Sequence, residues 1–134
     1  MSRKDPQLLT GLLTTMGALH FIAPEPFDSI IPPQLPGEPR AYTLASGVAE
    51  LMTAGLIAHR RTRKLGGAAA IALFLAVFPA NIYMAHQWRN QPWPLKAIAY
   101  GRLPLQALLI KQGRNVMKVA DAEVAADVKA DTGA

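Results

Sequence analysis

Five polar residues lie inside segments that are otherwise apolar enough to enter a membrane: His20, Glu50, Asn81, Arg102 and Gln106. Polar and ionisable groups are expensive at membrane depth, and those that a chain keeps there usually mark a ligand site or a proton path. A histidine or a glutamate can exchange protons, and an arginine can polarise an oxygen atom of a ligand. The five residues therefore form a candidate intramembrane ligand-binding site, in which we assign no catalytic residue.

Two of these residues carry opposite charges at nearly the same calculated depth. Glu50 and Arg102 each lie close to the middle of an apolar segment, and an arginine there costs about 2.5–3.5 kcal/mol to insert. Because Glu50 is the only acidic residue within the apolar segments, we expect the two to form an ion pair. Such a pair would either serve a ligand or lock the helices in register. His20 would either exchange protons or fill space as a hydrogen-bonded side chain.

Several kinds of chemistry find no support in the sequence. The chain has no cysteine, which excludes disulfides, thiol redox motifs and thiolate metal ligands within it. We expect no metal, because no HxxxH or ExxH spacing is present, and no phosphate loop, dinucleotide fingerprint or nucleophile–base pair is found. The net charge is +5, but the basic residues do not form a stripe with interleaved aromatics. We therefore expect no nucleic-acid partner.

Four apolar segments must position the polar residues: 8–23, 41–58, 65–85 and 95–110. Each has about 16 to 21 residues and would be about 24–32 Å long as a helix, close to the roughly 30 Å of a bilayer core. A soluble four-helix bundle is the alternative, but its helices would need a polar stripe, and the third segment has none before Asn81. We therefore predict an all-α integral membrane four-helix bundle.

Positive charge alternates along the segments that flank these spans. Lysine and arginine are frequent before the first span, between the second and third, and after the fourth, whereas the first and third connectors carry one arginine each. Since cytoplasmic loops are the basic ones, the pattern predicts a multi-pass protein of the cell (inner) membrane with both termini in the cytoplasm. The first segment could instead be a signal peptide, but no small-residue cleavage site follows it.

Prolines shape one connector and two of the spans. The first connector, residues 24–40, is proline-rich, which forbids a regular helix and predicts an outer loop that is either a cap on the bundle or a plain linker. Pro79 and Pro104 lie inside the third and fourth spans, where each should bend its helix and free a backbone carbonyl. We expect residues 1–118 to form the membrane domain and residues 119–134 a partly disordered cytoplasmic tail.

Four short motifs occur in order along the spans: GALHF, SGVAE, FPAN and RLPLQ. Over about residues 11–110 the chain resembles the DoxX-like family of small four-span bacterial membrane proteins. The resemblance carries over four groups of positions, which include all five polar residues named above. These positions are Gly17, His20 and Phe21; Ser46, Gly47 and Glu50; Pro79, Ala80 and Asn81; and Arg102, Leu103, Pro104 and Gln106.

The resemblance implies a redox-linked membrane subunit that works with a quinone, because the family takes its name from a subunit linked to thiosulfate:quinone oxidoreduction. Since the chain has no cysteine, electron transfer would need a bound quinone or the cofactor of a partner. A non-catalytic assembly or binding module and a small dimeric transporter are the alternatives, and whether the protein is an enzyme stays open. The expected partners are the lipid bilayer, a membrane or redox protein, and a second copy of the chain.

Overall fold

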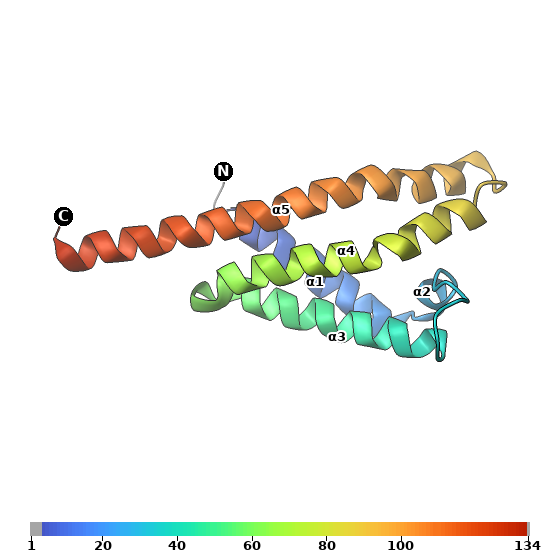
Figure 1. Ribbon diagram of the computed structural model, residues 1–134, viewed down its shortest axis with the longest axis horizontal. Helices are drawn as coiled ribbons and strands as arrows, with labels where there is room; N and C mark the ends of the chain where they lie inside the picture. The colour runs from blue at the N-terminus through green and yellow to red at the C-terminus, as the bar shows by residue number, and fades with distance from the viewer. Residues whose placement is uncertain (1–3, 134) are drawn as a thin grey trace.

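The computed structural model describes residues 4–133. Within this range every regular element is a helix, which confirms the all-α prediction. In chain order the elements are α1 (Lys4–Ile22), α2 (Glu25–Asp28), α3 (Pro39–Ala58), a 3₁₀ turn (Arg60–Thr62), α4 (Arg63–Gln87) and α5 (Trp93–Thr132). Figure 1 shows α3, α4 and α5 running alongside one another, with α1 crossing behind α4 and with α5 projecting beyond the other helices at one end.

Prolines lie both at the starts of helices and inside them. Pro39 is the first residue of α3 and Pro94 lies in the first turn of α5, where a missing N–H costs no helical hydrogen bond. Pro79 and Pro104 lie inside α4 and α5, and both helices continue through them. The prolines expected to bend the helices therefore do not end them.

Glycines set how the helices pair. A Cβ on Gly47 in α3 would lie 3.2 Å from the carbonyl oxygen of Gly17 in α1. A Cβ on Gly67 in α4 would lie 2.9 Å from the carbonyl oxygen of Gly113 in α5. Backbones approach this closely where side chains are absent. The bundle is therefore built from two tight pairs, α1 with α3 and α4 with α5, which are joined where α3 packs on α4.

Two apolar clusters fill the bundle. The larger one draws on all four long helices and consists of Leu9, Leu13, Ala54, Ile57, Ala70, Phe74 and Val116. The smaller one lies beside the proline-rich connector and consists of Ile30, Met84 and Ala99. Along the chain, Asn81 and Gln106 fall between members of the two clusters. The side chains of Asn81 and Gln106 therefore lie between two layers of apolar packing.

Two stretches of the described chain are long and apolar enough to span a membrane, Pro39–Ala58 and Arg60–Gln87. Large apolar side chains are also exposed on all four long helices. Among them are Leu8, Ile22, Met52, Leu75, Ile98 and Leu108. An exposed apolar surface of this extent is typical of a protein that contacts lipid or another protein.

The end of α5 lies beyond the predicted membrane domain. The helix continues through residues 119–132 and ends at Thr132. Lys64 Nζ lies 2.8 Å from Asp121, and Arg63 Nη1 contacts the Glu123 carboxylate. These ion pairs attach the end of α5 to the turn between α3 and α4, and the alanine content of this stretch favours a helix as well.

Candidate functional site

His20 and Glu50 meet where α1 crosses α3. The His20 Nδ1 atom lies 2.7 Å from the carbonyl oxygen of Met16 and 3.1 Å from Glu50 Oε2. Because the carbonyl can only accept a hydrogen bond, Nδ1 carries the hydrogen and directs it at Met16. Glu50 Oε2 is therefore buried in close contact with the ring without an aligned hydrogen bond. A buried carboxylate oxygen in this state is available to a proton or to a donor on a ligand.

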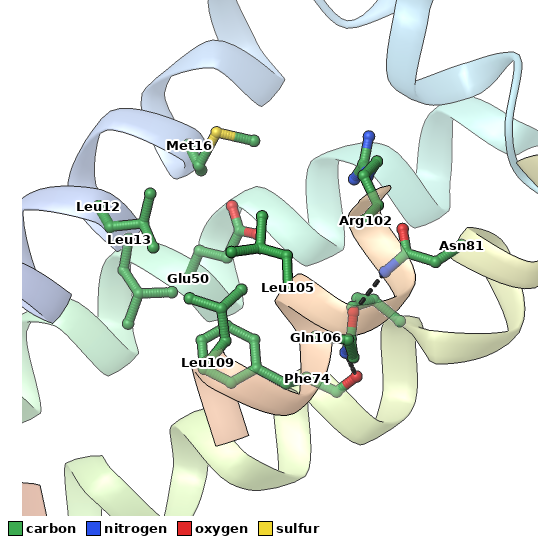
Figure 2. Close-up of a pocket in the computed structure, with 11 residues that line it drawn as sticks. Leu12, Leu13, Met16, Glu50, Phe74, Asn81, Arg102, Leu105, Gln106 and Leu109 are labelled. Carbon is green, nitrogen blue, oxygen red and sulfur yellow. Dashed lines mark hydrogen bonds between the residues drawn. The ribbon is translucent and has the colours of Figure 1, made fainter. Parts of the chain in front are cut away.

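Asn81 and Gln106 form a chain of amides between α4 and α5. Asn81 Nδ2 donates to Gln106 Oε1, and Gln106 Nε2 donates to the carbonyl oxygen of Phe74. Figure 2 shows this chain on one wall of the cavity. Both amides are almost fully buried, so each bond also spares a polar group from being left unpaired. Pro79 cannot donate to the carbonyl of Leu75, but the carbonyl that Gln106 uses is its neighbour, Phe74.

Arg102 does not form the expected ion pair with Glu50. Its Nη1 atom lies 3.5 Å from the sulfur of Met84, which is its only hydrogen-bond contact within residues 4–133. Glu50 instead lies against His20, and Figure 2 shows the Arg102 guanidinium apart from the Glu50 carboxylate, with no hydrogen bond between them. A thioether sulfur is a weak acceptor, so most of the five N–H donors of the guanidinium have no protein partner.

The register of α5 on α4 explains this difference. The predicted ion pair assumes that the middle of each apolar segment lies at the same depth in the membrane. In the structure, Gly113 instead packs against Gly67, and Ala99 joins the cluster of Met84. These contacts move Arg102 to the level of the last turn of α4, close to the proline-rich connector. Glu50 stays near the middle of α3 beside His20, so the two charges line the same cavities without forming an ion pair.

A cavity of about 280 Å³ lies among these residues. Its polar wall is formed by Glu50, Asn81, Arg102 and Gln106. The remaining wall is apolar and comes mainly from α1 and α5. Figure 2 shows Leu12, Leu13 and Met16 of α1 facing Leu105 and Leu109 of α5. The volume suits a single ring, at the lower end of the range for small-molecule pockets.

A second, smaller cavity of about 70 Å³ shares Glu50, Asn81 and Arg102 with the first. His20 lines this smaller cavity, together with Phe27 from the proline-rich connector. The two adjoining cavities thus bring all five predicted residues around one space. Within the described residues, no three His, Asp or Glu side chains cluster as a metal site would require.

The proline-rich connector covers the smaller cavity. The ring of Phe27 stacks on His20 with 3.8 Å between centroids. Arg40 Nε donates to Asp28 Oδ2 at 2.8 Å, which fastens the connector to the start of α3. The Thr43 hydroxyl and then the Arg40 guanidinium hold the pKa of the Asp28 carboxyl below its usual range. Of the two expectations for this connector, a cap or a plain linker, the structure has the cap. The prediction that its prolines exclude a helix is wrong for one turn, α2, because a proline in the first turn of a helix costs no hydrogen bond.

Three contributors to the site lie outside the sequence prediction. The carbonyl oxygens of Met16 and Phe74 accept hydrogen bonds from the site, and backbone groups leave no signature in a sequence. Thr43 is fully buried and lines the smaller cavity. It could have been found from its place one turn before Gly47, on the face of α3 that packs closely against α1.

Comparison with known protein families adds one match. A model described as a domain of unknown function, DUF8561, matches residues 9–117. No curated protein and no solved structure matches the chain. The matched range runs from the first turns of α1 to the middle of α5 and takes in both cavities and the cap. The chain therefore belongs to the DUF8561 family.

Proposed function

We propose that the protein is a four-span integral protein of the inner membrane, with α1, α3, α4 and the apolar part of α5 as its spans. Two stretches support this by length and composition alone. For α1 and α5 the support comes from exposed side chains such as Leu8, Ile22 and Leu108, each more than half exposed. Lipid would cover these side chains, whereas exposing so much apolar surface to water is unfavourable.

We further propose that both termini face the cytoplasm. Residues 6–11 of α1 lie beside Ile57, Ala58 and Arg63, and the end of α5 is paired with the same turn. Both ends of the described chain therefore meet at the basic turn between α3 and α4. The opposite end of the bundle carries the cap and the connector of residues 88–92 and is poorer in lysine and arginine. The basic end is the cytoplasmic one under the positive-inside rule.

Inside the membrane, the proposed function is to bind the ring of a lipid-soluble ligand with oxygen acceptors, of the quinone class. One observation carries this proposal: Arg102 lines the larger cavity with a thioether sulfur as its sole hydrogen-bond contact in the described chain. A ligand carbonyl would accept the hydrogen bonds that the protein leaves unused. The facing leucines of α1 and α5 would hold the ring, and Glu50 would exchange a proton with its oxygen.

The resemblance to the DoxX-like family supports a redox-linked role for such a site. In that role a quinone would accept electrons from a cofactor of a partner protein. The part of this chain would be to position the ring, to polarise an oxygen through Arg102, and to hold a proton at Glu50 beside His20.

The test of this proposal is the affinity of purified protein in lipid nanodiscs for a short-chain ubiquinone, followed by tryptophan fluorescence. We expect wild type to bind and Arg102→Gln to bind about tenfold or more weakly, since a hydrogen bond from a charged donor is worth about 1.5–3 kcal/mol. Arg89→Gln, in the connector between α4 and α5, is the matched control and should bind as wild type does. Unchanged affinity in Arg102→Gln, or a wild type that binds no quinone, contradicts the proposal.

A non-catalytic assembly module is the second candidate. It is favoured by the contacts that the site residues make across helices, His20 with Glu50 and Asn81 with Gln106, which would lock a bundle without a ligand. Under this reading Arg102→Gln would leave every quinone measurement unchanged, and affinity purification from membranes would recover a stable protein partner. A wild type that binds quinone and recovers no partner would exclude it.

A further inference from the structure

Three basic residues form a stripe on the exposed side of α5. Lys111, Arg114 and Lys118 come directly after the apolar part of α5 and are separated from one another by three and four residues. This spacing places them on one face of the helix. All three are exposed, whereas Gly113 on the other side of the helix is buried against α4. The basic stripe therefore points away from the bundle.

The basic stripe has no acidic partner in the protein. Three of the four neighbouring cations at the turn between α3 and α4 are paired. Arg60 lies against Asp127, Arg63 against Glu123 and Lys64 against Asp121. Three of the four acidic residues at the end of α5 are thus committed to this turn. Among residues 4–133, no ion pair or hydrogen bond involves the side chains of Lys111, Arg114 or Lys118.

The packing of α5 on α4 fixes the level of the basic stripe. Gly113 and Met117, which alternate with the stripe residues, pack against Gly67 and Ile71. These positions are two and six residues after Leu65, where the apolar part of α4 begins, or about 3–9 Å inward of it. A cation at that level is at the edge of the hydrocarbon region, where water alone solvates it poorly and an anionic group is favoured.

We propose that the basic stripe is a binding site for the phosphate groups of anionic phospholipids in the cytoplasmic leaflet. This inference rests on the proposed membrane insertion and orientation. The stripe residues supply the charge that such headgroups require. Pro104, Ala107 and Leu108 are exposed one to two turns further into the membrane, where they offer an apolar surface for the acyl chains of the same lipid.

The test is native mass spectrometry of the purified full chain, titrated with phosphatidylglycerol and with phosphatidylcholine of the same acyl chains. Wild type should prefer phosphatidylglycerol. Lys111→Gln/Arg114→Gln should lower that preference about 25-fold, because each cation near the membrane surface contributes about 1 kcal/mol, or about fivefold. Arg61→Gln/Lys129→Gln removes the same charge from exposed positions outside the basic stripe and should keep the preference. An unchanged preference in the stripe variant, or an equal loss in both variants, overturns the proposal.

Carbonate extraction of membranes that contain the protein tests the proposed membrane insertion separately from the lipid site. A protein that carbonate releases overturns both the membrane proposal and the lipid site. A protein that stays in the membrane pellet but lacks a preference for phosphatidylglycerol overturns the lipid site alone. The stripe variant should also bind short-chain ubiquinone as wild type does, since none of its residues lines the cavity.

Discussion

Gln106 links the two levels of α4 that border the cavity. Its amide accepts a hydrogen bond from Asn81 and donates one to the carbonyl of Phe74, two turns away. His20 and Glu50 are in close contact across α1 and α3, although the hydrogen on His20 Nδ1 is directed at the carbonyl of Met16. Arg102 is the exception, because its one hydrogen-bond contact within residues 4–133 is the weak acceptor sulfur of Met84. At the scale of residues, the site therefore combines side chains that hold the bundle with one whose donors are available to the proposed ligand.

Replacing Gln106 with leucine should destabilise the bundle. Gln106→Leu keeps a similar volume but removes both hydrogen bonds and leaves the buried Nδ2 of Asn81 unpaired. We expect a loss of about 1–2 kcal/mol in the free energy of unfolding, measured by denaturation in mild detergent. Gln91→Leu, at an exposed position in the connector before α5, should change it little. A Gln106→Leu protein as stable as wild type would show that the amide chain is not structural.

The sequence predicts which polar residues lie together in the bundle better than it predicts their partners. Insertion cost selects five residues that the structure places around two adjoining cavities. It pairs Glu50 with Arg102, however, because each segment is treated as if its centre lay at the same depth. The partner of Glu50 is decided by which turn of one helix meets which turn of the next, and this register depends on close packing that the hydropathy of a segment does not encode.

At the scale of elements, the glycines at the helix crossings determine the register between neighbouring helices. The α4 and α5 backbones approach at Gly67 and Gly113, and this contact fixes the register that carries Arg102 toward the cap. The sequence predicts the existence and type of the long helices from their apolar runs. It does not distinguish glycines at a crossing from those that face open space, such as Gly55, and so the helix pairs were not predictable.

Two alanine substitutions should therefore have opposite effects. Gly67→Ala would place a Cβ 2.9 Å from a backbone oxygen of α5, which forces the helices apart and should cost about 1–3 kcal/mol of stability. Gly55→Ala adds the same methyl group where nothing lies within 4 Å, and should stabilise α3 by up to about 1 kcal/mol. Thermal unfolding of both variants in the same detergent measures the difference. Two variants that shift the midpoint in the same direction would contradict the assigned crossing.

At the scale of the whole molecule, the bundle is closed by different means at its two ends. The cap closes one end through the Phe27–His20 stack and the Arg40–Asp28 ion pair. At the other end, ion pairs such as Arg63–Glu123 hold the extension of α5 against the basic turn between α3 and α4. Figure 1 shows this extension projecting past α3 and α4. The cavity lies between the two closures. Disturbing the charged end should therefore loosen α5 without changing the ligand site.

Glu123→Gln tests this separation. Glu123 and Arg63 are 16% and 17% exposed, and Arg63 also donates to the carbonyl of Ile57, so loss of the pair should cost about 1–2 kcal/mol and speed hydrogen exchange over residues 119–132. Asp127→Asn is the matched control, since its pair with Arg60 is more than half exposed and exposed pairs contribute little. Ubiquinone affinity should be the same in wild type and both variants. Equal hydrogen-exchange rates in the two variants would show that the Glu123–Arg63 pair does not hold the end of α5. A loss of ubiquinone affinity in Glu123→Gln would show that the α5 extension and the cavity are coupled.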